Sequence, residues 1–388
     1  MITRLFLISL MLPAMLARAA SPPFEFHDGD RVVFLGNTFI ERAQSYGHLE
    51  TLLTTALADR ALTFRNLGWS GDTVYGDARS YFGPPKEGFD RLTKHLDELK
   101  PHILIIAYGA VAAFEGEAGL PKFIEGYKTL LAMCQKTGAR VVLMSPPPAE
   151  NLPAPLPNQE AHNDRLALYR DAIRQLAKEG NHGFADVFGT LRDAWADLPH
   201  PLTENGIHFT EAGYAVIARL IAKTLGIDLA PLGIEINAST SEATLSDTRM
   251  QAVAASPQAV NVQLVPTNAV PRDLTVKVTG LADGDYTITN EHRKLTRANA
   301  AEMAKGLALT TEQWNPAISL LKHAIHKKNE LFFHSWRPQN ETYLFGFRKH
   351  EQGNNAVEIP QFAPLIQEQE ARIQTLKNAS PLTLSIKR

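Results

Sequence analysis

The sequence predicts an α/β protein: a three-layer α/β/α sandwich around a mainly parallel five-stranded sheet, followed by an α+β extension. Two observations predict the sandwich. Strand and helix signals alternate between residues 31 and 225, which favours a parallel sheet with helices on both faces. The strand candidates are short, apolar and rich in β-branched residues, as is typical of strands buried on both faces. Beyond residue 229 the alternation stops, and a different, mixed pattern predicts the extension.

The first half contains five strand candidates separated by helical patterns. The strand candidates are RVVFLG (31–36), LTFRNLG (62–68), HILIIAYG (102–109), ARVVLMS (139–145) and GFADVF (183–188). Helical periodicity covers residues 46–59, 87–99, 121–137 and 160–179. A further helix follows His208, with Thr210 as its N-cap. Ligands of such sheets bind at the carboxyl ends of the strands, so we expect a site there.

The second half mixes strand and helix signals. It opens with a polar, turn-rich stretch, residues 229–248. Strand-like alternation follows in 259–266, 273–281 and 284–290, and helical patterns cover 299–309 and 311–336. Residues 337–364 have a loop-like composition, and a helix over 364–377 is expected to finish the ordered part.

Composition limits the classes of function. A chain of 388 residues is long enough for two domains. The formal net charge of −2 gives no reason to expect nucleic acid as a partner. Cys134 is the only cysteine, which excludes an intramolecular disulfide, and its helical context predicts a buried thiol. The histidines are scattered and predict no metal site, and we expect no cofactor.

The first residues have the three parts of a secretory signal. Arg4 supplies a positive start, residues 5–16 an apolar run, and residues 17–19 a small-x-small cleavage site. The apolar run is too short to span a bilayer. We therefore expect residues 1–19 to be a cleaved signal peptide and the mature protein to be periplasmic or secreted, with no membrane span.

Four segments carry residue types that an ester hydrolase needs. Gly36-Asn37-Thr38 is a turn between a strand and a helix, a common place for a nucleophile. The glycines of NLGWSGDT (66–73) allow the backbone to approach a ligand and serve an oxyanion. IIAYGAVAAF (105–114) ends the third strand, and LTENGIHFTEAGY (202–214) places His208 before a helix.

These segments, in this order and spacing, resemble the blocks of the SGNH/GDSL hydrolase family over about residues 30 to 225. WSGDT, NGIHFTEAGY and the intervening VVLMSPPP carry the resemblance most closely. It implies ester hydrolysis of a small-molecule ester or acylated carbohydrate. It also implies roles for six residues, which are Thr38, His208 and Asn205 in catalysis and Gly71, Asn37 and Gly109 in oxyanion stabilisation or binding. The second half resembles an extension found in a bacterial subgroup of the family.

The site departs from the family pattern at several positions. Thr38 stands where the family has its nucleophilic serine, and Asn37 replaces an aspartate. Val111 stands at the position of the oxyanion asparagine, and Asn205 at that of the aspartate that orients the histidine. Loss of one oxyanion donor costs on the order of 10²–10³ in rate. We therefore expect a degenerate catalytic site; the alternative is an inactive protein of this fold that binds a glycan or a protein partner.

The expected domains are residues 20–228, with the hydrolase-like fold, and residues 229–388, an α+β extension packed on the first domain. The basis for packing is the density of aromatic side chains between residues 329 and 352. Alternation of aromatic and polar side chains there also suits carbohydrate binding, so both interpretations stay open.

Overall fold

The computed structural model describes residues 24–388, apart from residues 82, 228, 230–231, 246–249, 265–271, 292 and 379–381. The expected signal peptide, residues 1–19, lies outside this part. The first half is built on a five-stranded sheet in the order β2-β1-β3-β4-β5, in which all neighbours are parallel. The strands are β1 (Arg31–Gly36), β2 (Thr63–Gly68), β3 (Ile103–Ala107), β4 (Arg140–Met144) and β5 (Gly183–Ala185). The predicted sheet is thereby confirmed.

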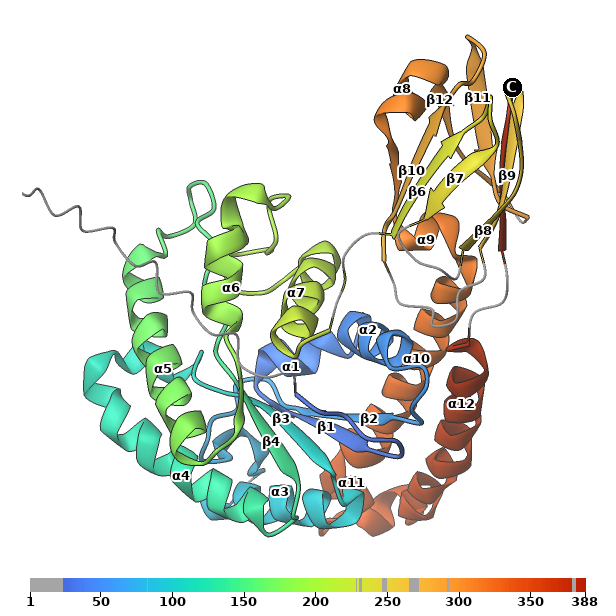
Figure 1. Ribbon diagram of the computed structural model, residues 1–388. Helices are drawn as coiled ribbons and strands as arrows, with labels where there is room; N and C mark the ends of the chain where they lie inside the picture. Colours follow the sequence, from blue (N-terminus) through green and yellow to red (C-terminus); the bar gives the residue numbers. More distant parts are fainter. Residues whose placement is uncertain are drawn as a thin grey trace, which may run out of the picture.

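Helices cover both faces of this sheet (Figure 1). One face packs against α3 (Pro85–Leu99), α4 (Leu120–Gln135) and α5 (Glu160–Glu179). The other packs against α1 (Thr38–Ala43), α2 (His48–Ala56), α6 (Val187–Ala194) and α7 (Glu211–Thr224). Successive residues of β3 serve opposite faces, since Leu104 and Ile106 join one core and Ile103 and Ile105 the other. This is the three-layer sandwich that the sequence predicts.

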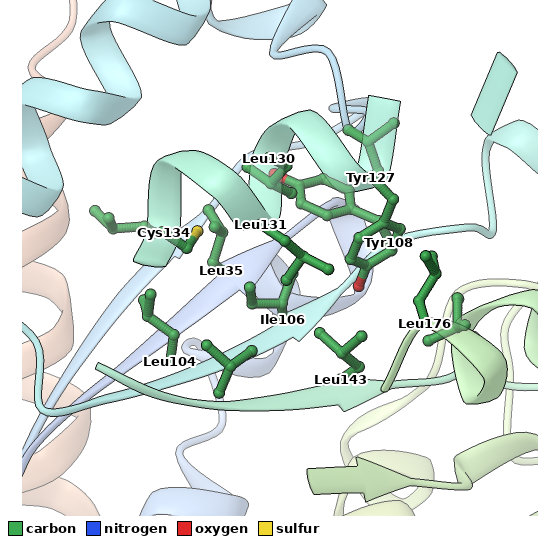
Figure 2. Packing of buried hydrophobic residues seen from close by; sticks show 14 of the residues in the cluster. Leu35, Leu104, Ile106, Tyr108, Tyr127, Leu130, Leu131, Cys134, Leu143 and Leu176 are labelled. Carbon is green, nitrogen blue, oxygen red and sulfur yellow. The ribbon is translucent and has the colours of Figure 1, made fainter. Parts of the chain in front are cut away.

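Figure 2 shows the first of these cores, in which α4 packs on β1, β3 and β4. Cys134 lies within it as a free, buried thiol. Burial raises the pKa of this thiol to about 12, so it stays protonated and unreactive at neutral pH. Cys134 is therefore a core residue, as its helical context indicates.

The second half contains a β-sandwich whose two sheets share one core. One sheet has the order β13-β10-β6-β7 and the other β12-β11-β14-β9-β8. Their strands are β6 (Leu232–Asn237), β7 (Glu242–Leu245), β8 (Met250–Ser256), β9 (Ala259–Leu264), β10 (Leu274–Thr279), β11 (Asp285–Thr289), β12 (Lys294–Asn299), β13 (Leu307–Leu309) and β14 (Leu382–Lys387). The predicted α+β class of the extension is confirmed, and in Figure 1 the sandwich stands beyond α9 (Thr311–Trp314).

Some of the boundaries expected here are wrong. Residues 229–248 were expected to be turns, but they contain β6 and β7. The strand signal of β6 is weak because Ile234 and Ile236 are its only buried residues. The chain was expected to end its order with a helix, yet β14 pairs between β11 and β9. The strand expected over residues 183–188 ends at Ala185, because the Asp186 side chain caps α6.

The second half also contains α8 (Ala300–Lys305), α9, α10 (Pro316–Trp336), α11 (Glu341–Leu344) and α12 (Phe362–Leu376). Helix α8 packs on β10 and β12 of the sandwich, whereas α10 contacts α2 and β2 of the first half. The single helix expected over 311–336 is divided at Asn315, whose side chain caps α10 ahead of Pro316. Short 3₁₀ helices are η1 (Asp77–Arg79), η2 (Ala112–Glu115), η3 (Glu117–Gly119), η4 (Trp195–Asp197), η5 (Lys349–Gln352) and η6 (Asn355–Gln361).

Helix α10 contacts the first half through a buried charge pair. Lys328 Nζ donates to Glu50 Oε1 of α2 at 2.6 Å and to the carbonyl of Phe64 in β2 at 2.9 Å. Asn329 Nδ2 donates to the other oxygen of Glu50 at 3.1 Å. Helices α10 and α12 lie beside the β2 edge of the sheet (Figure 1). Of the helices that the structure describes, none is long and apolar enough to cross a membrane.

Candidate active site

The turn after β1 packs so closely on β2 and β3 that Gly36 and Gly68 have no room for a side chain. A Cβ atom on Gly36 would lie 2.5 Å from the carbonyl oxygen of Ala107 in β3. One on Gly68, at the end of β2, would lie 2.2 Å from the amide nitrogen of Glu41. These glycines let α1 begin directly above the carboxyl ends of the central strands. The turn thus delivers Thr38, the first residue of α1, to the edge where ligands of parallel sheets bind.

Thr38 and Gly71 are brought together at this edge. The Thr38 Oγ1 atom accepts a hydrogen bond from the Gly71 amide at 3.0 Å. Gly71 has φ +74°, the left-handed conformation that glycine tolerates, in the turn after β2. A donor beside the candidate nucleophile is what an oxyanion hole requires.

Asn37 and Gly109 are placed differently from Gly71. The Asn37 side-chain oxygen accepts from the Phe39 amide at 3.1 Å, so it serves as the N-cap of α1. Gly109 has φ +111° and its carbonyl accepts from the Ala113 amide at 2.9 Å. The structure thus gives Asn37 a capping role and Gly109 a turn role. Their predicted contribution to oxyanion binding stays a prediction.

His208 is held by Asn205 in a defined orientation. The Asn205 Oδ1 atom accepts from the backbone amides of Ile207 at 3.2 Å and His208 at 2.9 Å. These two bonds fix the amide group, so the NH₂ end of Asn205 faces His208 Nδ1 at 3.1 Å. An amide NH₂ can only donate, so Nδ1 must accept and the ring proton of neutral His208 sits on Nε2. A histidine that serves as base needs the opposite tautomer.

The loop that carries His208 is anchored on a buried carboxylate. Glu150 accepts from the Thr203 amide at 2.7 Å, the Thr203 hydroxyl at 2.6 Å and the Leu202 amide at 3.0 Å. Its other partner is His200 Nδ1, at 2.7 Å. Burial alone would raise the pKa of Glu150, but these hydrogen bonds outweigh it and lower the pKa. Glu150 therefore stays charged and fixes the loop.

Thr38 and His208 line one pocket of about 230 Å³. Its wall is largely apolar and includes three side chains with unusually large exposure, Val111 at 37%, Phe114 at 59% and Ile207 at 42%. The remaining lining residues are Asn37, Phe39, Arg42, Ala110, Pro147, Pro148, Ala149, His162, Leu166 and Tyr214. Val111 offers no hydrogen-bond donor at its position. Beside the Thr38 hydroxyl and the His208 ring, the polar side chains of the lining are those of Asn37, Arg42, His162 and Tyr214.

Arg42 and His162 are site residues that the sequence analysis missed. Arg42 pairs with Glu204 at 3.0 Å, so the carboxylate that directly precedes Asn205 is directed to Arg42. Its position four residues after Thr38 places it on the same face of α1, and that spacing could have indicated it. The His162 ring stacks on Phe114 with 4.2 Å between the ring centroids. His162 comes from α5, far along the chain, and no local pattern indicates it.

The segment after β2 is tied to the end of β3 by a buried ion pair. Asp72 Oδ2 accepts from Arg79 Nε at 2.7 Å and from the Tyr108 hydroxyl at 2.7 Å. Arg79 also donates to the Leu67 carbonyl at 2.8 Å. All of these side chains are fully buried. The network fixes the two loops that carry Gly71 and Val111 relative to each other. Among the described residues, no group of three or more His, Cys, Asp or Glu side chains is arranged to hold a metal ion.

Comparisons with known proteins agree with this architecture. Residues 34–216 match the model of the GDSL-like lipase/acylhydrolase family. No curated protein matches the chain significantly. A solved structure of a gut microbial diltiazem-metabolizing enzyme is similar over 95% of this chain and 100% of its own, with a TM-score of 0.67 and 16% identity. At this identity the similarity shows the fold alone.

Two further solved structures overlap with about half of the chain. An acetylxylan esterase from Geobacillus stearothermophilus covers 52% of this chain and 96% of its own, at 18% identity and a TM-score of 0.43. An α/β hydrolase enzyme from the metagenome of Lake Arreo, Spain, covers 52% and 97%, at 21% identity and a TM-score of 0.43.

Proposed function

Since residues 34–216 belong to the GDSL-like lipase/acylhydrolase family, we propose that this protein binds a small acyl ester and hydrolyses it slowly, through a degenerate site. In this proposal the Thr38 hydroxyl is the nucleophile and the Gly71 amide stabilises the oxyanion. His208 is the base, and Asn205 orients it. The observation that carries the proposal is the pairing of Thr38 with the Gly71 amide at 3.0 Å, in a pocket that His208 also lines.

The same geometry accounts for a low rate. In the free protein the Asn205 amide places the ring proton of His208 on the nitrogen that would have to accept the Thr38 proton. Asn205 also brings no negative charge to stabilise an imidazolium. Val111 contributes no second donor to the oxyanion. Each of these changes raises the barrier to acyl transfer without closing the pocket.

The substrate we propose is a small-molecule ester or an acylated carbohydrate. The apolar wall of the pocket suits a short acyl group, since apolar surface removed from water stabilises the complex by about 25 cal/mol per Å². Arg42 lies at the same pocket and provides a cationic, multiply donating group for a polar part of the substrate. We further propose that the protein acts in the periplasm or outside the cell, on the basis of the secretory pattern in residues 1–19.

Turnover of p-nitrophenyl acetate tests the proposal. We expect the parent protein to turn over well below about 10 s⁻¹, a typical enzyme rate. Thr38→Val keeps the shape of the side chain and removes its oxygen, so it should reduce turnover to the uncatalysed rate. Thr129→Val, at an exposed position on α4, is the matched control and should leave turnover unchanged. Equal rates for the Thr38→Val variant and the parent would exclude Thr38 as nucleophile.

A binding function is the second candidate, favoured by the tautomer that Asn205 imposes on His208. In that case the protein keeps the pocket and binds a glycan or a protein partner without hydrolysis. Absence of any turnover above background in the parent, together with saturable binding of an acetylated oligosaccharide in calorimetry, would favour this candidate over the first.

A further inference from the structure

The end of helix α10 reaches the loop that carries Gly71. Arg337 directly follows α10, and its guanidinium lies 3.8 Å from the centroid of the Trp69 ring. Trp336 packs edge-to-face on the same ring at 5.7 Å. Trp69 is itself buried. The C-terminal extension therefore covers the start of the segment 69–71, here called the donor loop.

Glu41 connects Arg337 to the backbone of the donor loop. Its Oε2 atom pairs with Arg337 Nη1 at 2.9 Å. The same oxygen accepts a hydrogen bond from the Ser70 amide. Glu41 lies on α1, one turn after Thr38. One carboxylate oxygen of Glu41 thus connects α1, the donor loop and the C-terminal extension.

Gly71 depends on these neighbours for its position. A Cβ atom built on Gly71 would meet no atom within 4 Å, so nothing packs against that side of the residue. Trp69 is fixed by its amide, which donates to the Gly36 carbonyl at 2.9 Å, and by the Arg337 and Trp336 contacts. Ser70 is fixed through Glu41. The direction of the Gly71 amide is therefore set on one side by Trp69 and Ser70 and on the other by Asp72, which Arg79 and Tyr108 hold.

We propose that Arg337 is a positioning residue of the site. It holds Glu41 and Trp69 so that the Gly71 amide points at Thr38 Oγ1 and, during ester hydrolysis, at the oxyanion. The inference rests on the proposed function for its catalytic consequence. It makes the C-terminal extension a part of the active site, in contrast to an extension that is only attached to the first half.

The chemistry of arginine fits both contacts. Its planar guanidinium stacks on an indole ring and donates in its own plane to a carboxylate, which the compact ammonium of lysine cannot do together. Arg337→Met removes the charge and the donors and keeps an apolar stem beside Trp69. Arg337→Lys keeps the charge. The two variants separate loss of the whole interaction from loss of its geometry.

Arg348 provides a matched control within the extension. It pairs with Glu351 at 2.6 Å at an exposed position, and it has no contact with the donor loop among the described residues. Arg348→Met therefore removes the same group from the same part of the chain.

Hydrogen exchange of the backbone amides tests the inference without relying on turnover. In Arg337→Met we expect the amides of Ser70 and Gly71 to exchange at least about 10-fold faster, while amides within α10 keep the parent rates. Arg348→Met should leave both sets unchanged. Unchanged exchange at Ser70 and Gly71 would overturn the inference. Equal acceleration in the donor loop and in α10 would also overturn it, because Arg337 would then only hold α10 against the first half.

The catalytic consequence is measured in an Asn205→Asp background, where we expect higher turnover of p-nitrophenyl acetate. There Arg337→Met should lower kcat by about 10- to 100-fold, the scale of a misplaced catalytic group, with KM within about twofold. Arg337→Lys should restore part of kcat. An unchanged kcat in an active background contradicts the inference. If neither background hydrolyses the ester, the proposed function fails, and the exchange result still decides the role of Arg337.

Discussion

The two sides of the pocket differ in what maintains them. On the Thr38 side, the hydrolase geometry is made of backbone: Gly36 and Gly68 fit where a Cβ would collide with Ala107 or Glu41, and the Gly71 amide reaches the hydroxyl. On the His208 side, the buried Glu150 anchors the loop, but the orientation of the ring depends on an exposed side chain, that of Asn205. Gly36 and Gly68 are required for α1 to pack on β2 and β3. An exposed side chain such as that of Asn205 is not required for this packing.

Because of this difference, the glycines of the turns and the side chains of the pocket carry different information about function. Gly36 and Gly68 do not report activity, because the packing of β1, β2 and β3 requires them in any case. In the proposed function, the rate depends on side chains such as Val111 and Asn205, which are exposed and can change without cost to the core. Changing each side separately therefore shows which one limits turnover.

Asn205→Asp is expected to have the largest effect. The new carboxylate would keep the two backbone hydrogen bonds and accept from His208 Nδ1, which moves the lone pair to Nε2. We expect kcat for p-nitrophenyl acetate to rise by up to about 10⁴-fold, the size of the loss caused by the reverse change in a serine protease triad. Asn158→Asp, at an exposed loop position, adds the same charge as a control. No rise in kcat would mean that the His208 side does not limit turnover.

Val111→Asn should come next. Val111 lines the pocket and is 37% exposed, so an amide can be introduced there without disturbing the core. In the Asn205→Asp background, the added donor should raise kcat by about 10²–10³-fold, the usual contribution of one oxyanion donor. Val111→Leu, which adds no donor, is the control. If both variants at position 111 behave alike, the Gly71 amide alone serves the oxyanion.

Much of the site's scaffold could be predicted from the sequence. The five buried strands are continuous apolar runs, and their order along the chain placed Thr38, Gly71 and His208 at one edge of the sheet. The pocket brings Thr38 and His208 together, and the hydrogen bond joins Thr38 to Gly71. Local patterns sufficed because each of these residues lies within a regular element or three residues from one.

Other features could not be predicted, because they depend on contacts distant in the chain. The stacking of His162 on Phe114 joins α5 to η2, and the contact of Arg337 with Trp69 joins α10 to the turn after β2. The tautomer of His208 follows from hydrogen bonds of Asn205 that only coordinates reveal. The strand β14 was missed because a short alternating segment at the chain end gives a weak signal until its partners β9 and β11 are known.

Glu150→Gln tests whether the His208 side is held as firmly as the Thr38 side. The amide would place an NH₂ group against the donors of Thr203, leaving buried groups without a partner. We expect the free energy of unfolding in urea to fall by about 1–3 kcal/mol. Glu117→Gln, at an exposed position, should change it by less than about 0.5 kcal/mol. A loss no larger than in the control would show that the carboxylate does not anchor the loop.

The smallest effect is expected from pH, through His200. Its hydrogen bond to the Trp195 carbonyl and its contact with Glu150 raise the pKa of His200 above its ordinary value of about 6.5. The stabilisation by protonated His200 is therefore fully present below that ordinary value and is lost as pH rises through the raised pKa. Because the His200 side chain is partly exposed, the loss should be below about 1 kcal/mol.

His200→Gln isolates this contribution, because glutamine keeps a hydrogen-bonding side chain but does not titrate. The difference in unfolding free energy between the parent and the variant should shrink as pH rises from 6 to 9, with no matching change for His323→Gln on α10. A difference that is constant over this range would assign the anchoring of the His208 loop to Glu150 and the backbone alone.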